Sequence, residues 1–246
     1  MPSPKLKPED FAKLYAGFEA PVSRFDCGKK CSPLNNGTPY CCSTQMAVPV
    51  VEKSEFAFLK SRTDLWHRFK PYDAATRQIV ADLHPGACAV ECKGAAFCER
   101  ENRTLACRAF PFFPYFTRQK EFIGLSVYWV FEDRCWMISN MGLVEKPFVD
   151  AFVTTFEAIF AKDKLEFDTY VDFSASMRRV FSRWGRVIPV IGCDGKPIFL
   201  DPSTGEPAKR PPRDYPRYEP FDSEAHYRAA VKEAGGTPPP EGLKPV

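Results

Sequence analysis

The sequence predicts an α+β fold in which a cysteine-rich first part is followed by amphipathic helices and a proline-rich tail. Nine of the ten cysteines precede residue 136. In that part, short stretches with helical spacing of apolar residues alternate with β-branched and aromatic runs, whereas helical spacing dominates after residue 147. At 246 residues the chain is long enough for one substantial core with appendages.

We expect three segments along the chain. Residues 1–146 form a cysteine-cluster domain with short helices and β-hairpins, and residues 147–200 form a helical segment with a β-hairpin packed on it. Residues 201–246 are rich in proline and charge and contain few large apolar residues, so we expect an extended or disordered tail there.

In the first segment, the apolar residues between 11 and 18 fall at i, i+3, i+4 and i+7, which predicts a short amphipathic helix. The stretch 25–44 is full of Pro, Asn and Gly and is expected to be a loop. "MAVPVV" suits a short edge strand, because Pro49 cannot donate to a β-ladder. Residues 52–83 read as two or three short helices, and residues 116–131 read as a hairpin.

The second segment contains two apolar stripes at helical spacing, one from Phe148 to Phe160 and one from Phe173 to Trp184, which we interpret as core packing. "VIPVIGCDGKPIFL" predicts a hairpin around Asp194-Gly195, a pair that suits a type I′ turn.

Composition and charge argue against two kinds of partner, nucleic acid and membranes. The formal net charge is +3, and basic residues are interleaved with acidic ones, so binding to nucleic acid is unlikely. No stretch of about 18 apolar residues could span a membrane, and the N-terminus lacks the apolar core of a secretory signal. We therefore expect a cytoplasmic protein whose partner is an unknown protein or small molecule.

Thiols are kept reduced in the cytoplasm, so a dense cysteine pattern there indicates a metal or a reactive thiol before it indicates disulfides. Thiolate sulfur suits zinc, copper(I) and iron–sulfur clusters. Buried inert thiols do not explain cysteines on stretches rich in Pro, Asn and Lys. The candidate metal ligands are Cys27, Cys31, Cys41, Cys42, Cys92, Cys98, Cys107 and Cys135.

The remaining two cysteines are treated separately. Cys193 lies in an apolar strand and is expected to be a small buried hydrophobe. Cys88, beside His84, is ambiguous. Spacing alone leaves open two zinc ions, one cluster with spare thiols, or two clusters. The adjacent Cys41 and Cys42 can serve one centre only if the backbone turns sharply, because neighbouring side chains of an extended segment point to opposite sides.

The order of these features resembles the YkgJ-type cysteine-cluster family of zinc- or iron-chelating proteins. "FDCGKKCSPLNNGTPYCC" is similar to the family's opening Phe and its Cys-x2-Cys-x2-Cys-Cys loop, although three and nine residues replace the two short spacers. "CERENRTLACRAFPF" is similar to the later part that ends in Cys-Arg-x-Phe-Pro, with Thr104 in place of a proline. Cys92 or Cys88 takes the place of the middle cysteine, and Cys135 fits the last position.

The resemblance implies a cysteine-bound metal that helps to hold residues 1–146 together, with an iron–sulfur cluster preferred and Zn²⁺ as the alternative. It implies redox chemistry or modification of a protein or metabolite; the other interpretation is a zinc-chelating structural or accessory module. A thiolate centre is negatively charged, and Arg103 and Arg108 are the candidate donors to its sulfurs. No phosphate-binding loop, dinucleotide fingerprint or H-E-x-x-H motif is present, and whether the protein is an enzyme is left open.

Overall fold

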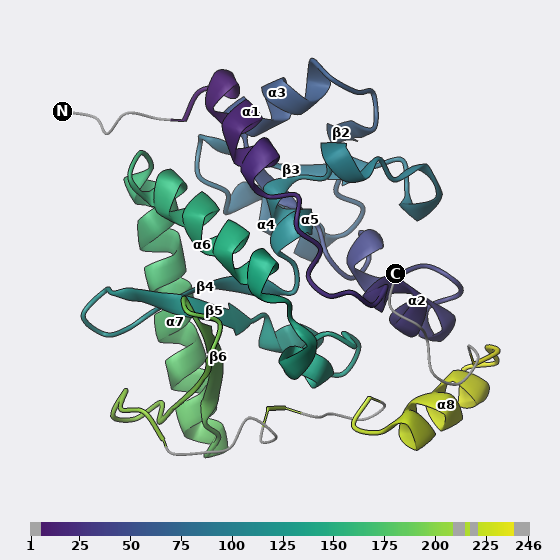
Figure 1. The fold of residues 1–246 in the computed structure, drawn as a ribbon. Coiled ribbons are helices and arrows are strands. Elements are labelled where there is room, and N and C mark those ends of the chain that lie inside the picture. Colours follow the sequence, from purple (N-terminus) through teal and green to yellow (C-terminus); the bar gives the residue numbers. More distant parts are fainter. Residues whose placement is uncertain (1–5, 209–214, 217–220, 239–246) are drawn as a thin grey trace.

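The computed structural model describes residues 6–208, 215–216 and 221–238, and it confirms a mixed α+β architecture (Figure 1). The strands form two antiparallel sheets. The first has the order β1-β3-β2, with strands β1 (Val50–Glu52), β2 (Trp66–Arg68) and β3 (Ala87–Cys92). The second has the order β4-β5-β6-β7, with strands β4 (Phe112–Phe116), β5 (Phe122–Val127), β6 (Ile188–Gly192) and β7 (Pro197–Leu200).

The helices divide between the two sheets. α1 packs on α3 beside the first sheet and also contacts α6, while α7 packs on β4 and β6 of the second sheet (Figure 1). The described α-helices are α1 (Pro8–Gly17), α2 (Cys27–Cys31), α3 (Lys53–Lys60), α4 (Ala74–Ala81), α5 (Leu105–Ala109), α6 (Lys146–Phe160), α7 (Lys164–Trp184) and α8 (Glu224–Glu233). None of these helices of the described residues is long and apolar enough to cross a bilayer.

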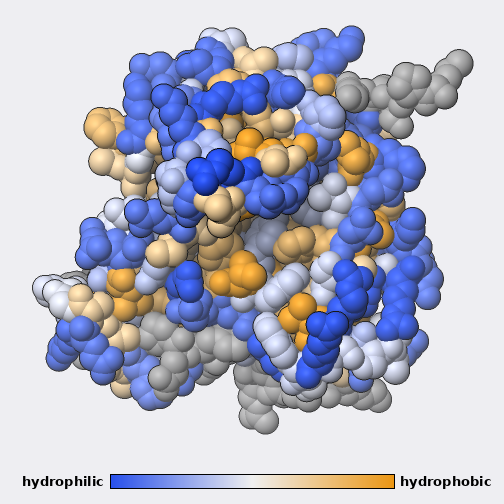
Figure 2. Space-filling view, turned by 180° about the vertical axis from the view of Figure 1, so that it is seen from behind, coloured by the Kyte–Doolittle hydropathy of each residue, from blue (hydrophilic) through white to orange (hydrophobic). Residues whose placement is uncertain are grey.

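One cluster of buried hydrophobic residues runs from Leu6 to Val231 and contains residues from both sheets. The predicted boundary at residue 146 therefore crosses a shared core. On α6 the predicted stripe is confirmed, since Phe148, Phe152 and Phe156 are buried. In Figure 2, the hydrophobic residues on the face shown lie in separate small groups among hydrophilic ones, as is usual for a protein surface.

Several local predictions are confirmed and others need correction. The first helix, the hairpin of β6 and β7 and the two long helices are present, whereas the hairpin predicted over residues 116–131 begins earlier, at Phe112, and ends at Val127. The stretch 25–44 is not a loop throughout, because it contains α2 and the 3₁₀ turns η1 (Ser32–Leu34) and η2 (Tyr40–Cys42). Strand β2 separates the two helices of residues 52–83, and Cys88 lies in strand β3.

The turn between β6 and β7 also differs from the prediction. The Gly195 N–H donates to the Gly192 carbonyl at 2.7 Å, and only Gly195 has a positive φ there, of 84°. A type I′ turn needs positive φ at both central residues, and Asp194 does not have it. The turn is therefore centred on Cys193 and Asp194, with Gly195 supplying the left-handed residue that returns the chain to β7.

Helix α8 was not predicted, because it lies in the segment expected to be extended or disordered. Ser223 caps it by accepting a hydrogen bond from the His226 N–H at 3.1 Å, and Tyr227 and Val231 bury one face. A cap residue followed by two apolar residues four apart is a helix signal, but it is short and surrounded by proline and glycine. The other residues of the predicted tail are described only in part.

A buried carboxylate joins three elements of the first half. Glu55 of α3 accepts hydrogen bonds at 2.7 Å from the Tyr15 hydroxyl of α1 and from the Leu105 N–H of α5. Burial raises the pKa of Glu55 to about 7, although these two donors and Arg108 oppose the rise; nearby Glu52 adds to it. The protonated form is therefore favoured in the folded state.

This arrangement predicts a pH-dependent contribution to stability. A carboxyl whose pKa is higher in the folded than in the unfolded state stabilises the fold fully below the unfolded value and loses that contribution as pH rises through the folded value. We expect the contribution to disappear between about pH 4.5 and pH 7 and to amount to roughly 3 kcal/mol.

Glu55→Gln keeps the acceptor oxygen and removes the titration. Chemical denaturation of both proteins at several pH values should show that the variant gains stability relative to the wild type as pH rises from 4.5 to 8. A difference in unfolding free energy that stays constant over this range would contradict the assignment.

Candidate functional site

The first cysteine pair is placed by a short helix. Asp26 caps α2 through hydrogen bonds from the N–H groups of Gly28, at 3.0 Å, and Lys29, at 3.3 Å, as expected for an aspartate at the N-cap. Cys27 and Cys31 lie at the two ends of this helix. Residues four apart share one side of a helix, so the two thiols face the same region.

The nine residues between Cys31 and the cysteine doublet fold back on themselves. The Gly37 N–H donates to the Ser32 carbonyl at 2.8 Å, and the Tyr40 hydroxyl donates to the Leu34 carbonyl at 3.0 Å. The doublet then lies in the 3₁₀ turn η2, where the Cys41 and Cys42 sulfurs are 4.0 Å apart. This is the sharp turn that two adjacent ligands of one centre require.

The middle cysteines follow the end of a strand. Cys92 is the last residue of β3, and Gly94, with φ of 107°, lets the chain reverse immediately after it. Cys98 comes after one further 3₁₀ turn, and its sulfur accepts a hydrogen bond from Arg103 Nε at 3.1 Å. Of the two predicted arginine donors, Arg103 is thus directed at a thiol.

Cys107 lies on α5, which Thr104 caps by accepting a hydrogen bond from the Cys107 N–H at 3.0 Å. Thr104 therefore has a structural role at the start of this helix. Cys135 follows η5 (Trp129–Phe131), with its N–H bonded to the Phe131 carbonyl at 2.8 Å, and is buried.

The predicted ligands influence one another electrostatically. Burial raises the pKa of Cys27 to about 11 and of Cys31 and Cys107 to about 12, and the charge of Cys42 adds to each of these shifts. Burial likewise raises the pKa of Cys92, with smaller contributions from Cys42 and Cys98. Cys135 has its pKa raised by burial and then by its two α2 neighbours, Cys27 and Cys31.

We call these eight cysteines, Cys27, Cys31, Cys41, Cys42, Cys92, Cys98, Cys107 and Cys135, the thiol group. The other two lie among different charges. Burial raises the pKa of Cys88, and its charged neighbours are Arg68, Lys53, Glu52 and Glu55. For Cys193 burial also raises the pKa, and its charged neighbours are Glu157 and Asp194. All ten cysteines are free thiols.

The spacing of the thiol group limits what it can bind as it stands. Within the described part of the chain, no three cysteine sulfurs lie within 4.8 Å of one another. Four sulfurs around one zinc ion, each about 2.3 Å from the metal, would be about 3.8 Å apart. Several of these thiols lie near enough to shift one another's pKa, but no three of the described sulfurs are as close together as a single tetrahedral ion requires.

Comparison of the chain with protein-family models, with curated proteins and with solved structures gives no match. The resemblance to the YkgJ-type family therefore stays a prediction from the quoted motifs. What can be said about function depends on the geometry of the residues described.

Arg108, the second predicted arginine, donates to backbone carbonyls. Its guanidinium donates to the carbonyls of Tyr15 at 3.2 Å, Phe18 at 2.5 Å, Glu101 at 2.7 Å and Arg103 at 3.1 Å. It also lies over the Tyr15 ring, 4.4 Å from the centroid. The contacts seen for Arg108 therefore fix the chain on either side of the thiol group.

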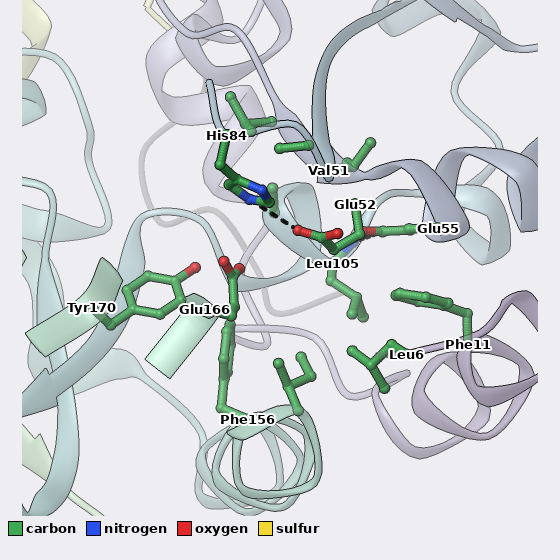
Figure 3. A pocket seen from close by; sticks show the side chains of 14 residues that line it. Leu6, Phe11, Val51, Glu52, Glu55, His84, Leu105, Phe156, Glu166 and Tyr170 are labelled. Atoms are coloured by element: carbon green, nitrogen blue, oxygen red, sulfur yellow. Dashed lines mark hydrogen bonds and ion pairs between the residues drawn. The ribbon is translucent and has the colours of Figure 1, made fainter. Parts of the chain in front are cut away.

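A second cluster of functional side chains was not predicted. Glu52, His84 and Glu166 line a cavity of about 60 Å³ together with Glu55 and Tyr170 (Figure 3). His84 Nε2 is 3.1 Å from Glu52 Oε1. Burial raises the pKa of Glu166 to about 8, and repulsion by Glu52 adds to the rise.

Of the three, only His84 stands out in the sequence, four residues before Cys88, where a histidine can be a ligand, a donor to a sulfur or a turn cap. It does cap a turn, since the Gly86 N–H donates to its Nδ1 at 3.1 Å. Nothing in the sequence marks Glu52 or Glu166 as a ligand, because each stands in a charged stretch that resembles the solvent-exposed side of an ordinary helix or strand.

The Cys41-Cys42 doublet predicts which thiol of the metal-free protein reacts first with an alkylating reagent. Hydrogen bonding from the neighbouring Cys41 thiol lowers the pKa of Cys42 to about 7, against its burial, and Arg103 assists. The thiolate is the reactive form, so Cys42 should be alkylated by iodoacetamide at pH 7.5 before Cys31 and Cys107, which burial keeps protonated.

Timed alkylation followed by peptide mass spectrometry measures the order of reaction. Cys41→Ala removes the donor and should slow alkylation of Cys42 several-fold while leaving the rate at Cys193 unchanged. If Cys107 were alkylated before Cys42, the Cys41 thiol would not be lowering the pKa of Cys42.

Proposed function

We propose that the thiol group binds a metal centre, preferably an iron–sulfur cluster, and that the protein uses it in redox chemistry or in modification of a protein or metabolite. The observation that supports this is the convergence of eight thiols from separate segments, with the Cys41-Cys42 turn among them. We further propose a cytoplasmic location, where these free thiols would stay reduced.

The electrostatics of the thiol group favour a cation. Bringing several buried thiols together raises their pKa, because each thiolate charge disfavours the next and burial disfavours all of them. A metal centre replaces the protons and neutralises the sulfurs, so its binding energy becomes folding energy. Residues 1–146 would then be stabilised from within by the centre.

A cluster does not require three sulfurs within 4.8 Å of one another, which the described cysteines do not show. Thiolates that bind different irons of one cluster lie farther apart than thiolates on one ion. Hydrogen bonds to cluster sulfurs and burial tune the potential of such a centre. Arg103, which donates to Cys98 at 3.1 Å, is placed to do this. When bound, a cluster would supply one-electron transfer.

Burial supports the alternative function. Cys31 and Cys135 are less than 10% exposed. Ligands enclosed in this way are typical of structural sites, in which every coordination position is filled by protein. We therefore keep a zinc-chelating structural or accessory module as the second candidate.

Anaerobic purification with metal and sulfide analysis separates the two candidates. Brown protein that contains iron and acid-labile sulfide is expected if the centre is a cluster. Colourless protein with stoichiometric zinc would favour the structural module. Protein without either metal and with paired cysteines would overturn both.

Single substitutions test the ligand assignment. Cys42→Ser and Cys107→Ser should lose bound metal and show a lower midpoint of thermal unfolding, because each removes one of the thiolates that bind the metal. Cys193→Ser is the matched control, since Cys193 lies outside the group, and it should keep the wild-type metal content. Full metal content in the first two variants would defeat the assignment.

A further inference from the structure

Three elements that are far apart in sequence bring metal-ligating side chains to one place. Glu52 ends β1, His84 lies in the turn before β3, and Glu166 is in the first turn of α7. One ligand atom from each lies within 4.8 Å of the other two. The three side chains point toward a common space in Figure 3.

The backbone holds two of these residues close together. Glu52 is paired with Ala87 across β1 and β3, and the Lys53 N–H donates to the Gly86 carbonyl at 2.8 Å. A Cβ at Gly86 would lie 3.0 Å from His84 Cε1 and 3.1 Å from Glu52 Oε2. Glycine therefore permits the approach of the imidazole to the carboxylate.

The third ligand comes from a different layer. Asp163 caps α7 by accepting hydrogen bonds from the N–H groups of Leu165, at 3.0 Å, and Glu166, at 3.1 Å. This fixes the first helical turn, from which the Glu166 side chain enters the cavity (Figure 3). Among the residues that the structure describes, none makes a hydrogen bond or ion pair with the partly buried Glu166 carboxylate.

Three carboxyl groups and one imidazole face the cavity. Glu52, Glu55 and Glu166 line it, and its described lining contains neither lysine nor arginine. Its volume of about 60 Å³ exceeds the roughly 15 Å³ that one water needs. It therefore has room for an ion with one or more waters.

We propose that Glu52, His84 and Glu166 bind a first-row divalent metal ion in a site separate from the thiol group. Imidazole and carboxylate ligands suit manganese, iron and zinc ions. The distance of 3.1 Å from His84 Nε2 to Glu52 Oε1 fits two neighbouring ligands, each about 2.1 Å from one ion. Three protein ligands leave coordination positions for water or a substrate.

Metal binding would rearrange a proton on His84. Because the Gly86 N–H donates to Nδ1, the ring proton is on Nε2 and bridges to Glu52. An ion on Nε2 takes the place of this proton, and the neutral ring carries its proton on Nδ1 instead. Binding should therefore end the contact with Gly86.

The test uses Mn²⁺, which prefers oxygen and nitrogen ligands to thiolates, so the protein can be kept as purified with its thiol group intact. Loss of the free Mn²⁺ signal in electron paramagnetic resonance should show one bound ion per chain. Glu166→Gln and His84→Gln should each weaken binding roughly tenfold or more. Glu157→Gln, an exposed carboxylate on α6, is the matched control and should leave affinity unchanged.

A second measurement keeps the proposal falsifiable if a variant folds poorly. Addition of Zn²⁺ in excess of the amount that the thiol group takes up should shift the His84 nitrogens of the ¹⁵N-labelled wild type from the Nε2–H to the Nδ1–H pattern. Cys42→Ser should still bind Mn²⁺, whatever becomes of its thiol centre. Absence of Mn²⁺ binding, equal affinity in all variants, or loss of binding in Cys42→Ser would overturn the proposal.

Discussion

The first half of this protein depends on how α5 is held. Arg108 of α5 donates to four backbone carbonyls, two at the end of α1 and two in the segment that precedes α5. Glu55 of α3 accepts a hydrogen bond from the Leu105 N–H at the start of α5 and another from the Tyr15 hydroxyl of α1. Breaking these partly buried hydrogen bonds leaves the carbonyls and the Glu55 carboxyl unpaired, which is more costly than the net gain from forming them. Helices α1, α3 and α5 are therefore fixed as one unit.

This unit connects the two candidate sites. Cys107 of α5 belongs to the thiol group, whereas Leu105 and Ala106 line the cavity of Glu52, His84 and Glu166. The two sites differ in chemistry, since one offers soft sulfur ligands and the other offers oxygen and nitrogen ligands.

Local patterns predicted much of the fold. The amphipathic stripe of α6 is buried as expected, because apolar side chains at helical spacing can satisfy their burial only along one face. The stripe of α7 is buried at Met177 and Phe181 but ends at Trp184, which is half exposed and stacks on Phe181 and Arg186. Predictions failed where one residue sets a turn, as at Gly195, or where a short helix is made of cap and loop residues, as in α2 and α8.

The sequence by itself determined which residues carry sulfur atoms suited to a soft metal. The helical spacing of apolar residues also determined the two long helices, α6 and α7. Only the tertiary structure decided which thiols share a region and which, like Cys88 and Cys193, lie among other charges. It alone brought Glu52, His84 and Glu166 together, because a carboxylate becomes a candidate ligand only when distant elements bury it beside a second donor.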